Sequence, residues 1–370
     1  MKPRAIAASA LVATLALSGC GKAETKTDST GSNTTGPLKA AWIYVGPAND
    51  GGWSQAHDEG RKAVEKALGD KVKTTFKEIV NEEQGIATTI DDLVKDGNKI
   101  IFATSFGYGK AMKEASEKYK DVKFEWATGD SPAANMSIYF GAGEESLYLT
   151  GIAAGKATKS NKIGFVAPFD IPEVVRHINA FTLGVQSVNP QATVKVLKTL
   201  SWTDAAKARQ HAESLIGEGA DVIASGVDGP SPGDAAKEKG AKWVGYDADQ
   251  SQNYPNVWLT AAVYHWGPYY TKQVQSVIDG NWKSGAYYGN IKDGLTDIAP
   301  FGSSVDADTQ KLIQEKRSEI VDGKLKVFAG PIMDQDGMEK VAAGSELPFA
   351  DQMGITWWVK GVDAPKVETK

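Results

Sequence analysis

Acidic and aromatic residues recur in glycine-rich segments that directly follow short apolar runs. The segment 46–54 (GPANDGGWS) carries Asp50 and Trp53 and follows the apolar run 41–45. Its small residues let the backbone approach a ligand closely, and an exposed indole offers a flat surface on which a base can stack. Asp228 and Asp247 lie in similar segments, where they can accept hydrogen bonds from ligand N–H or O–H groups. These residues are therefore candidates for binding a small molecule.

Further aromatic residues complete the candidate site. They lie at or near the ends of apolar runs: Tyr44, Phe106, Phe169 and Trp266. Structural alternatives stay open at this stage. An Asp in such a position commonly caps a helix or stabilises a turn, and Trp53 packs into the core if its loop is a tight turn.

Motifs for catalysis are incomplete. The Gly-x-Gly at 107–109 lacks the third glycine of a dinucleotide-binding fingerprint, because that position is Met112. The segment 229–233 matches the letters of a Gly-x-Ser-x-Gly elbow around Ser231. That elbow needs a backbone N–H on the next residue, which is Pro232 and has none. We therefore predict a binding protein rather than an enzyme, without a cofactor.

The histidines are scattered and lack the spacing of a zinc site, so no metal is predicted. They are His57, His177, His211 and His265. We expect His57 and His177 on the surfaces of two helices. Asp306 and Asp308 begin a polar helical stretch, where their charges favour the N-terminus.

The N-terminal residues carry an export signal. Lys2 and Arg4 precede an apolar run over 5–17, and small residues follow. The sequence Leu17-Ser18-Gly19-Cys20 resembles the lipobox of bacterial lipoproteins, and Cys20 is the only cysteine of the chain. We expect residues 1–19 to be a signal peptide, Cys20 to be lipidated, and 20–37 to be a flexible tether. An ordinary secretory signal with a chance cysteine is the alternative.

Composition narrows the partners and the location. A net charge of −5 argues against nucleic acid, which calls for a basic face. The apolar run is too short to span a bilayer, and no later segment is long enough. We therefore expect a body in the cell envelope, lipid-anchored on the periplasmic side or the extracellular face.

Short apolar runs alternate with longer amphipathic stretches in two sets that divide near residue 145. The expected strands are 41–45, 99–104, 124–127, 162–166, 221–225, 242–246 and 257–260, and the expected helices are 54–68, 110–119, 172–188, 234–239 and 268–279. Such alternation predicts an α/β fold with two doubly wound, Rossmann-like lobes. Ligands bind at the carboxyl ends of such strands, so we expect a cleft between the lobes.

The expected boundaries follow from these two sets. The first lobe comprises 38–145 and about 263–300, and the second comprises 146–262 and about 301–350. Residues 351–370 are expected to form a C-terminal tail.

Several short motifs resemble the basic membrane protein (BMP) family of lipoproteins, which includes the PnrA-like purine nucleoside receptors. They are Asp50-Gly51-Gly52-Trp53-Ser54, Gly219-Ala220-Asp221-Val222-Ile223, Gly245-Tyr246-Asp247-Ala248-Asp249-Gln250 and Phe328-Ala329-Gly330-Pro331-Ile332. The resemblance implies the fold of type I periplasmic binding proteins. It also implies capture of a purine nucleoside or a related compound for an ABC importer.

The family's ligand-binding positions match unevenly. Trp53 stands where the family stacks a Phe on the purine, and Asp247 matches the Asp that holds the ribose hydroxyls. Ser54 replaces the Asn that reads the base edge, Thr128 replaces an acidic residue, and 260–266 lacks the family's sugar-binding Lys. Because the residues that read the base and the residues that bind the sugar have both changed, we expect a free purine base, adenine foremost, ahead of a nucleoside.

The expected partners are this small molecule, which the cleft captures by closing, and an ABC permease in the membrane; the protein itself is expected to be a monomer. Two other functions remain possible from the sequence. One is a sensor subunit for a membrane signalling protein, and the other is an exported nucleoside hydrolase.

Overall fold

The computed structural model describes residues 36–367, and its compact unit begins at Pro37. The expected signal peptide, the lipidation site Cys20 and nearly all of the tether lie outside the described residues. Within 36–367, no helix has both the length and the apolar character needed to cross a bilayer.

The first sheet has six parallel strands in the order β11-β5-β4-β3-β1-β2. The strands are β1 (Leu38–Ile43), β2 (Val72–Lys77), β3 (Ile100–Ala103), β4 (Lys123–Ala127), β5 (Met136–Gly141) and β11 (Ala286–Gly289). Helices α1 (Trp53–Leu68) and α8 (Gly267–Ile278) pack together on one face, and α2 (Ile86–Lys95) and α3 (Gly109–Lys118) cover the other.

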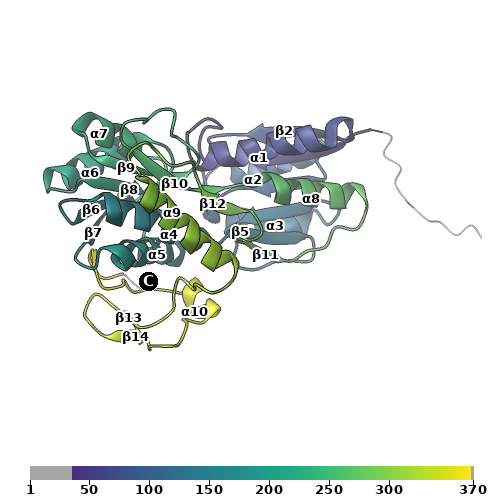
Figure 1. The fold of residues 1–370 in the computed structure, drawn as a ribbon. Helices are drawn as coiled ribbons and strands as arrows, with labels where there is room; N and C mark the ends of the chain where they lie inside the picture. Colours follow the sequence, from purple (N-terminus) through teal and green to yellow (C-terminus); the bar gives the residue numbers. More distant parts are fainter. Residues whose placement is uncertain (1–35, 368–370) are drawn as a thin grey trace, which may run out of the picture. The chain divides into compact units, whose positions relative to one another are not determined.

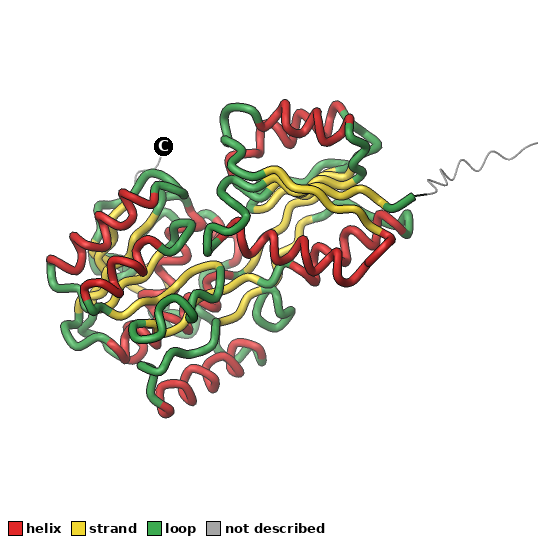
Figure 2. The backbone as a smooth tube through the Cα atoms, turned by 90° about the horizontal axis from the view of Figure 1, so that it is seen from above, coloured by secondary structure: helices red, strands yellow, loops and turns green. Residues whose placement is uncertain are grey.

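The second sheet has seven strands in the order β12-β10-β9-β8-β6-β7-β15, and only β12 runs antiparallel to its neighbour. The strands are β6 (Lys162–Ala167), β7 (Thr193–Lys198), β8 (Val222–Ser225), β9 (Lys242–Asp247), β10 (Trp258–Tyr264), β12 (Thr296–Ile298) and β15 (Val362–Asp363). Helices α4 (Gly143–Ala157), α5 (Pro172–Val188) and α9 (Ala307–Val321) lie on one face. Helices α6 (Ala205–Gly217) and α7 (Ser231–Lys239) lie on the other, so the strands run between two helical layers (Figure 2).

Strand burial explains this layering. All four residues of β3, all four of β8 and all seven of β10 are buried. A strand that is apolar on both faces must be covered on both faces. Trp42, Trp126, Trp243 and Trp258 lie in these cores. The α/β fold with doubly wound parallel sheets is thereby confirmed.

The chain passes between the two sheets after β5, after β10 and after β11. The expected assignment of all of 263–300 to the first lobe is wrong at its end. Residues Thr296–Ile298 pair with β10 in the second sheet, because the return to that sheet comes directly after β11.

The described part of the expected tail, 351–367, is not a tail. Helix α10 (Phe349–Met353) starts it, and β15 pairs with β7 (Figure 1). Trp358 and Val359 are each 1% exposed, and the Asn179 side chain bonds the backbone of this segment at Trp357 O (2.8 Å) and Val359 N (2.9 Å). These apolar side chains extend the second lobe's core. A hairpin of β13 (Ile332–Met333) and β14 (Glu339–Val341) precedes it.

Candidate functional site

A pocket of about 360 Å³ lies where the carboxyl ends of the two sheets meet. Its lining residues lie after strands of the first sheet, or at or after the ends of strands of the second sheet. They are Val45, Trp53, Ser105, Phe106, Thr128, Glu173, Trp202, Asp228, Tyr246 and Asp247. This is the edge at which open parallel sheets bind ligands. We call it the interlobe pocket.

Trp53 begins α1 and forms an aromatic wall of the interlobe pocket. Its indole N–H donates to the backbone oxygen of Thr104 at 2.6 Å, and its side chain is almost fully buried. His57 and Trp266 pack edge-on against the indole, with ring centroids 4.2 and 5.7 Å away. The ring is thus held in one orientation before any ligand arrives, which lowers the entropic cost of stacking.

Asp247 ends β9 and brings an unpaired carboxylate to the interlobe pocket. It is 1% exposed, and neither of its carboxylate oxygens has a hydrogen-bond partner within residues 36–367. Its φ of +68° lies in the left-handed region, which is costly for a residue other than glycine. Such a costly arrangement is typical of a functional site.

Asp228 adds a second acceptor from the loop after β8. Its Oδ2 atom is buried and likewise lacks a partner among the described residues. Burial raises the pKa of both Asp228 and Asp247 well above the usual range, and nearby carboxylates, including Asp50 and Glu173, raise it further. A ligand that donates hydrogen bonds to these oxygens satisfies buried groups that have no partner within residues 36–367.

Glu173 is a pocket residue that the sequence reasoning missed. It lies in the first turn of α5, directly after Pro172, and burial raises its pKa to about 7. Its only sequence signal is its place after the strand 162–166, which Phe169 shares.

Four of the eight predicted binding residues line the interlobe pocket: Trp53, Phe106, Asp228 and Asp247. Phe106 is 47% exposed and so remains accessible. The other four lie outside the lining. Trp266 is buried behind Trp53 and stacks on His57, and Phe169 packs edge-on against Trp202.

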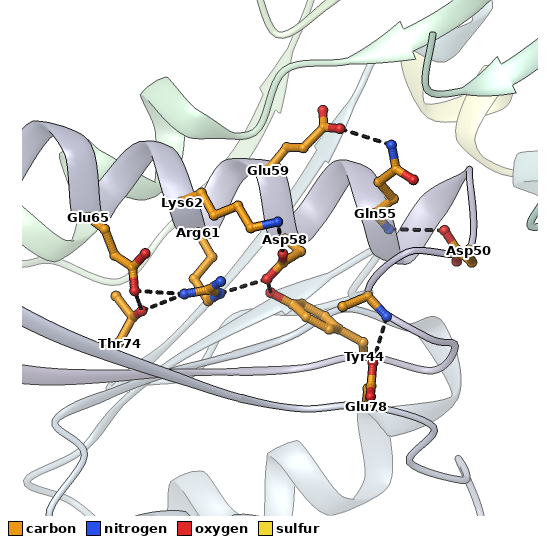
Figure 3. A network of polar contacts seen from close by, with 11 residues as sticks. Tyr44, Asp50, Gln55, Asp58, Glu59, Arg61, Lys62, Glu65, Thr74 and Glu78 are labelled. Carbon is orange, nitrogen blue, oxygen red and sulfur yellow. Dashed lines mark hydrogen bonds and ion pairs between the residues drawn. The ribbon is translucent and has the colours of Figure 1, made fainter. Parts of the chain in front are cut away.

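Asp50 and Tyr44 have structural contacts instead. The Asp50 carboxylate accepts from the backbone N–H groups of Gly52 (2.8 Å), Ser54 (3.0 Å) and Gln55 (3.0 Å), and so caps the start of α1. Figure 3 shows the contact with Gln55. The buried Tyr44 hydroxyl donates to Asp58 at 3.2 Å, beneath the same helix (Figure 3). Asp50 therefore caps a helix, which was the structural alternative to ligand binding.

The expectation that His57 and His177 are surface residues is wrong. His57 Nδ1 lies 2.5 Å from the Tyr270 hydroxyl, and His177 Nδ1 lies 3.3 Å from that of Tyr246. Both rings are buried among aromatic side chains, and burial lowers both pKa values well below the usual range. The neutral imidazole packs there as an aromatic ring with one polar contact.

Comparisons with known proteins agree with this geometry. A sequence model of the family described as "ABC transporter substrate-binding protein PnrA-like" matches residues 38–327. A purine-binding protein of Brucella abortus (strain 2308) is 41% identical over 326 residues, which cover 88% of this chain and 93% of that protein. A putative ABC transporter glucose-binding protein of Haloferax volcanii is 36% identical over 313 residues, covering 85% and 80%.

More distant matches agree on the architecture. An ABC transporter nucleoside-binding protein of Lactococcus lactis subsp. cremoris is 26% identical over 355 residues, covering 88% of this chain and 99% of that protein. Among solved structures, a solute-binding protein of an ABC transporter system from Aeropyrum pernix K1 superposes with a TM-score of 0.69. It is 18% identical and covers 78% of this chain and 93% of that one, so it supports the fold alone.

Proposed function

Because the chain belongs to the PnrA-like family of ABC transporter substrate-binding proteins, we propose that it captures a purine nucleobase, adenine foremost, for an ABC permease. The family consists of binding proteins rather than enzymes, and we assign no catalytic role. The proposed location is the cell envelope, with the body tethered through lipid on Cys20.

One observation carries the proposal: the indole of Trp53 lines the same pocket as Asp228 and Asp247, whose buried Oδ2 atom and buried carboxylate, respectively, have no hydrogen-bond partner within residues 36–367. Stacking on an aromatic side chain contributes about 1–3 kcal/mol per base. Buried acceptors without partners call for a ligand with N–H donors. Free adenine offers both its amino group and a ring N–H, whereas in adenosine the ring N–H is replaced by the bond to ribose.

Capture by closure is supported by contacts between the two strand-end loops. The side-chain amide of Gln250, from the second lobe, donates to the backbone oxygen of Gly51 at 2.6 Å. A Cβ atom on residue 52 would lie 2.7 Å from the backbone nitrogen of Gly229, so only glycine permits this approach. A ligand held by Trp53 on one side and Asp247 on the other binds both lobes and favours the closed state.

A sugar is the second candidate. Carboxylate acceptors and an indole also suit sugar hydroxyls and a sugar's apolar face, and the Haloferax volcanii relative is described as a putative glucose-binding protein. The described lining of the interlobe pocket offers carboxylate acceptors but no side-chain amide or cation that could donate to sugar oxygens. This lining favours the purine over the sugar.

Calorimetric titration with adenine, adenosine and glucose tests the proposal. We expect adenine to bind most tightly, and no adenine to appear when the protein is incubated with adenosine. If adenosine binds at least tenfold more tightly than adenine, the proposed ligand is the nucleoside and not the free base. Binding of glucose without any purine would favour the sugar.

A further inference from the structure

A second and larger cavity adjoins the interlobe pocket. It is open to solvent, spans about 1450 Å³ including that solvent, and shares Phe106, Thr128 and Glu173 with the interlobe pocket. The rest of its wall comes from the loop after β4, from β5 and β11, from the start of α5 and from α10. Its apolar members include Ile138, Phe140, Ile171, Pro172, Phe349 and Met353. We call it the apolar groove.

Three polar side chains along the apolar groove are already paired. The Tyr288 hydroxyl donates to Glu144 at 2.8 Å, and Arg176 lies 3.3 Å from the same carboxylate. The Tyr139 hydroxyl pairs with that of Tyr270 at 2.8 Å. A ribose placed beside these three groups would give up water without gaining free partners from them, which costs free energy.

An apolar group, unlike a ribose, is stabilised when it enters the apolar groove. Phe349 is 56% exposed and packs edge-on against Tyr288, with ring centroids 5.3 Å apart. Phe106, at the junction with the interlobe pocket, is 47% exposed. Covering these rings with apolar ligand atoms removes apolar surface from water, which is favourable.

We propose that the apolar groove is a subsite for an apolar substituent on the base that occupies the interlobe pocket. The ligand class is then a purine bearing a hydrocarbon or aromatic group, rather than a nucleoside. This inference rests on the proposed function, because the base must be held by Trp53 and the two carboxylates for its substituent to reach the apolar groove.

The test is calorimetric titration of the full chain with adenine, N6-benzyladenine and 9-benzyladenine, which carry the same group at two positions. We expect at least one benzyl derivative to bind about tenfold more tightly than adenine, as burial of an aromatic ring implies. Phe349→Ala should remove most of that gain and leave adenine affinity unchanged. Met338→Ala is the matched control, because Met338 is 64% exposed in the same C-terminal segment and lies outside the apolar groove.

The outcomes separate this inference from the proposed function. If adenine binds and neither benzyl derivative binds more tightly, the apolar subsite is overturned and the purine pocket stands. A gain that survives Phe349→Ala also overturns it. If neither adenine nor its derivatives bind, the proposed function fails, and the subsite fails with it.

Discussion

At the scale of single residues, Asp247 shows most clearly how stability and binding conflict. Its carboxylate is buried and unpaired, and its backbone has a positive φ. Each feature disfavours the folded state without a ligand. The proposed ligand compensates by donating a hydrogen bond to the carboxylate.

Asp247→Asn should therefore weaken adenine binding and stabilise the unliganded protein. Loss of a charge-assisted hydrogen bond of about 1.5–3 kcal/mol corresponds to about 10–150-fold weaker binding. The raised pKa means that Asp247 lowers the stability of the fold as pH rises through that pKa, and Asn lacks this effect. Titration calorimetry and thermal unfolding at pH 8 measure both effects.

The control for this variant is Asp249→Asn, an exposed neighbour in the same loop. It should change neither quantity. A lower melting temperature of Asp247→Asn would contradict the idea that Asp247 destabilises the unliganded protein.

Trp53→Ala should weaken adenine binding by about 5–150-fold, the equivalent of 1–3 kcal/mol of stacking. Trp53→Phe keeps an aromatic face and should retain most of the affinity. Circular dichroism must show both variants folded, because the indole is also buried. An unchanged dissociation constant in Trp53→Ala would remove this residue from the site.

At the scale of elements, the sequence predicted α5 and the polar start of α9, but it missed the amphipathic α2 as well as α4 and β2. Helix α5 spans Pro172–Val188 as predicted, because its polar and apolar residues recur at helical spacing. Helix α4 was missed because it is buried on most sides between α5, α9 and β10, which removes the contrast. Strand β2 was missed because it is an exposed edge strand with the polar sequence VKTTFK.

Glu125 shows how an element can bury an ionisable group outside the lining of the interlobe pocket. It lies in β4 and is 0% exposed. Its carboxylate accepts from the Tyr269 hydroxyl of α8 and from the Trp282 indole, each at 2.8 Å. Burial raises its pKa to about 7.

Glu125→Gln should make stability less dependent on pH. Because the folded pKa lies above the unfolded value, the stability from neutral Glu125 is complete below about pH 4.5 and is lost as pH rises through about 7. The loss amounts to as much as about 3 kcal/mol. Urea unfolding at pH 5 and pH 8 should show a smaller difference in the free energy of unfolding for the variant than for the wild type.

The exposed Glu117 in α3 provides the control for that experiment. Glu117→Gln should reproduce the wild-type difference between the two pH values. If Glu125→Gln shows the same difference in unfolding free energy between pH 5 and pH 8 as the wild type, Glu125 is ionised in the folded protein at both pH values.

At the scale of the whole molecule, two α/β lobes meet at their strand ends and the C-terminal segment packs on the second lobe (Figure 1). The proposed lipid tether would hold such a body near the proposed permease, where released ligand is needed. The export signal expected from the sequence and the observed fold thus favour the same proposed function.

Cys20→Ser should release the protein from the membrane. The wild type is expected in the membrane fraction and to incorporate labelled fatty acid, because two or more acyl chains anchor stably. The variant should appear in the soluble fraction without label. Equal membrane retention of the variant would argue against a lipid anchor at this position.

The sequence by itself determined the alternation of strands and helices, the glycine-rich loops after the strands, and the choice of Trp53, Asp228 and Asp247 as candidate binding residues. These features depend on local spacing, which a single chain displays directly. Only the tertiary structure decided which candidates face the interlobe pocket. Trp266 and Tyr44 also lie near strand ends, yet they pack beneath α1. The pocket is built from side chains far apart in the chain, and the packing of two sheets sets their directions.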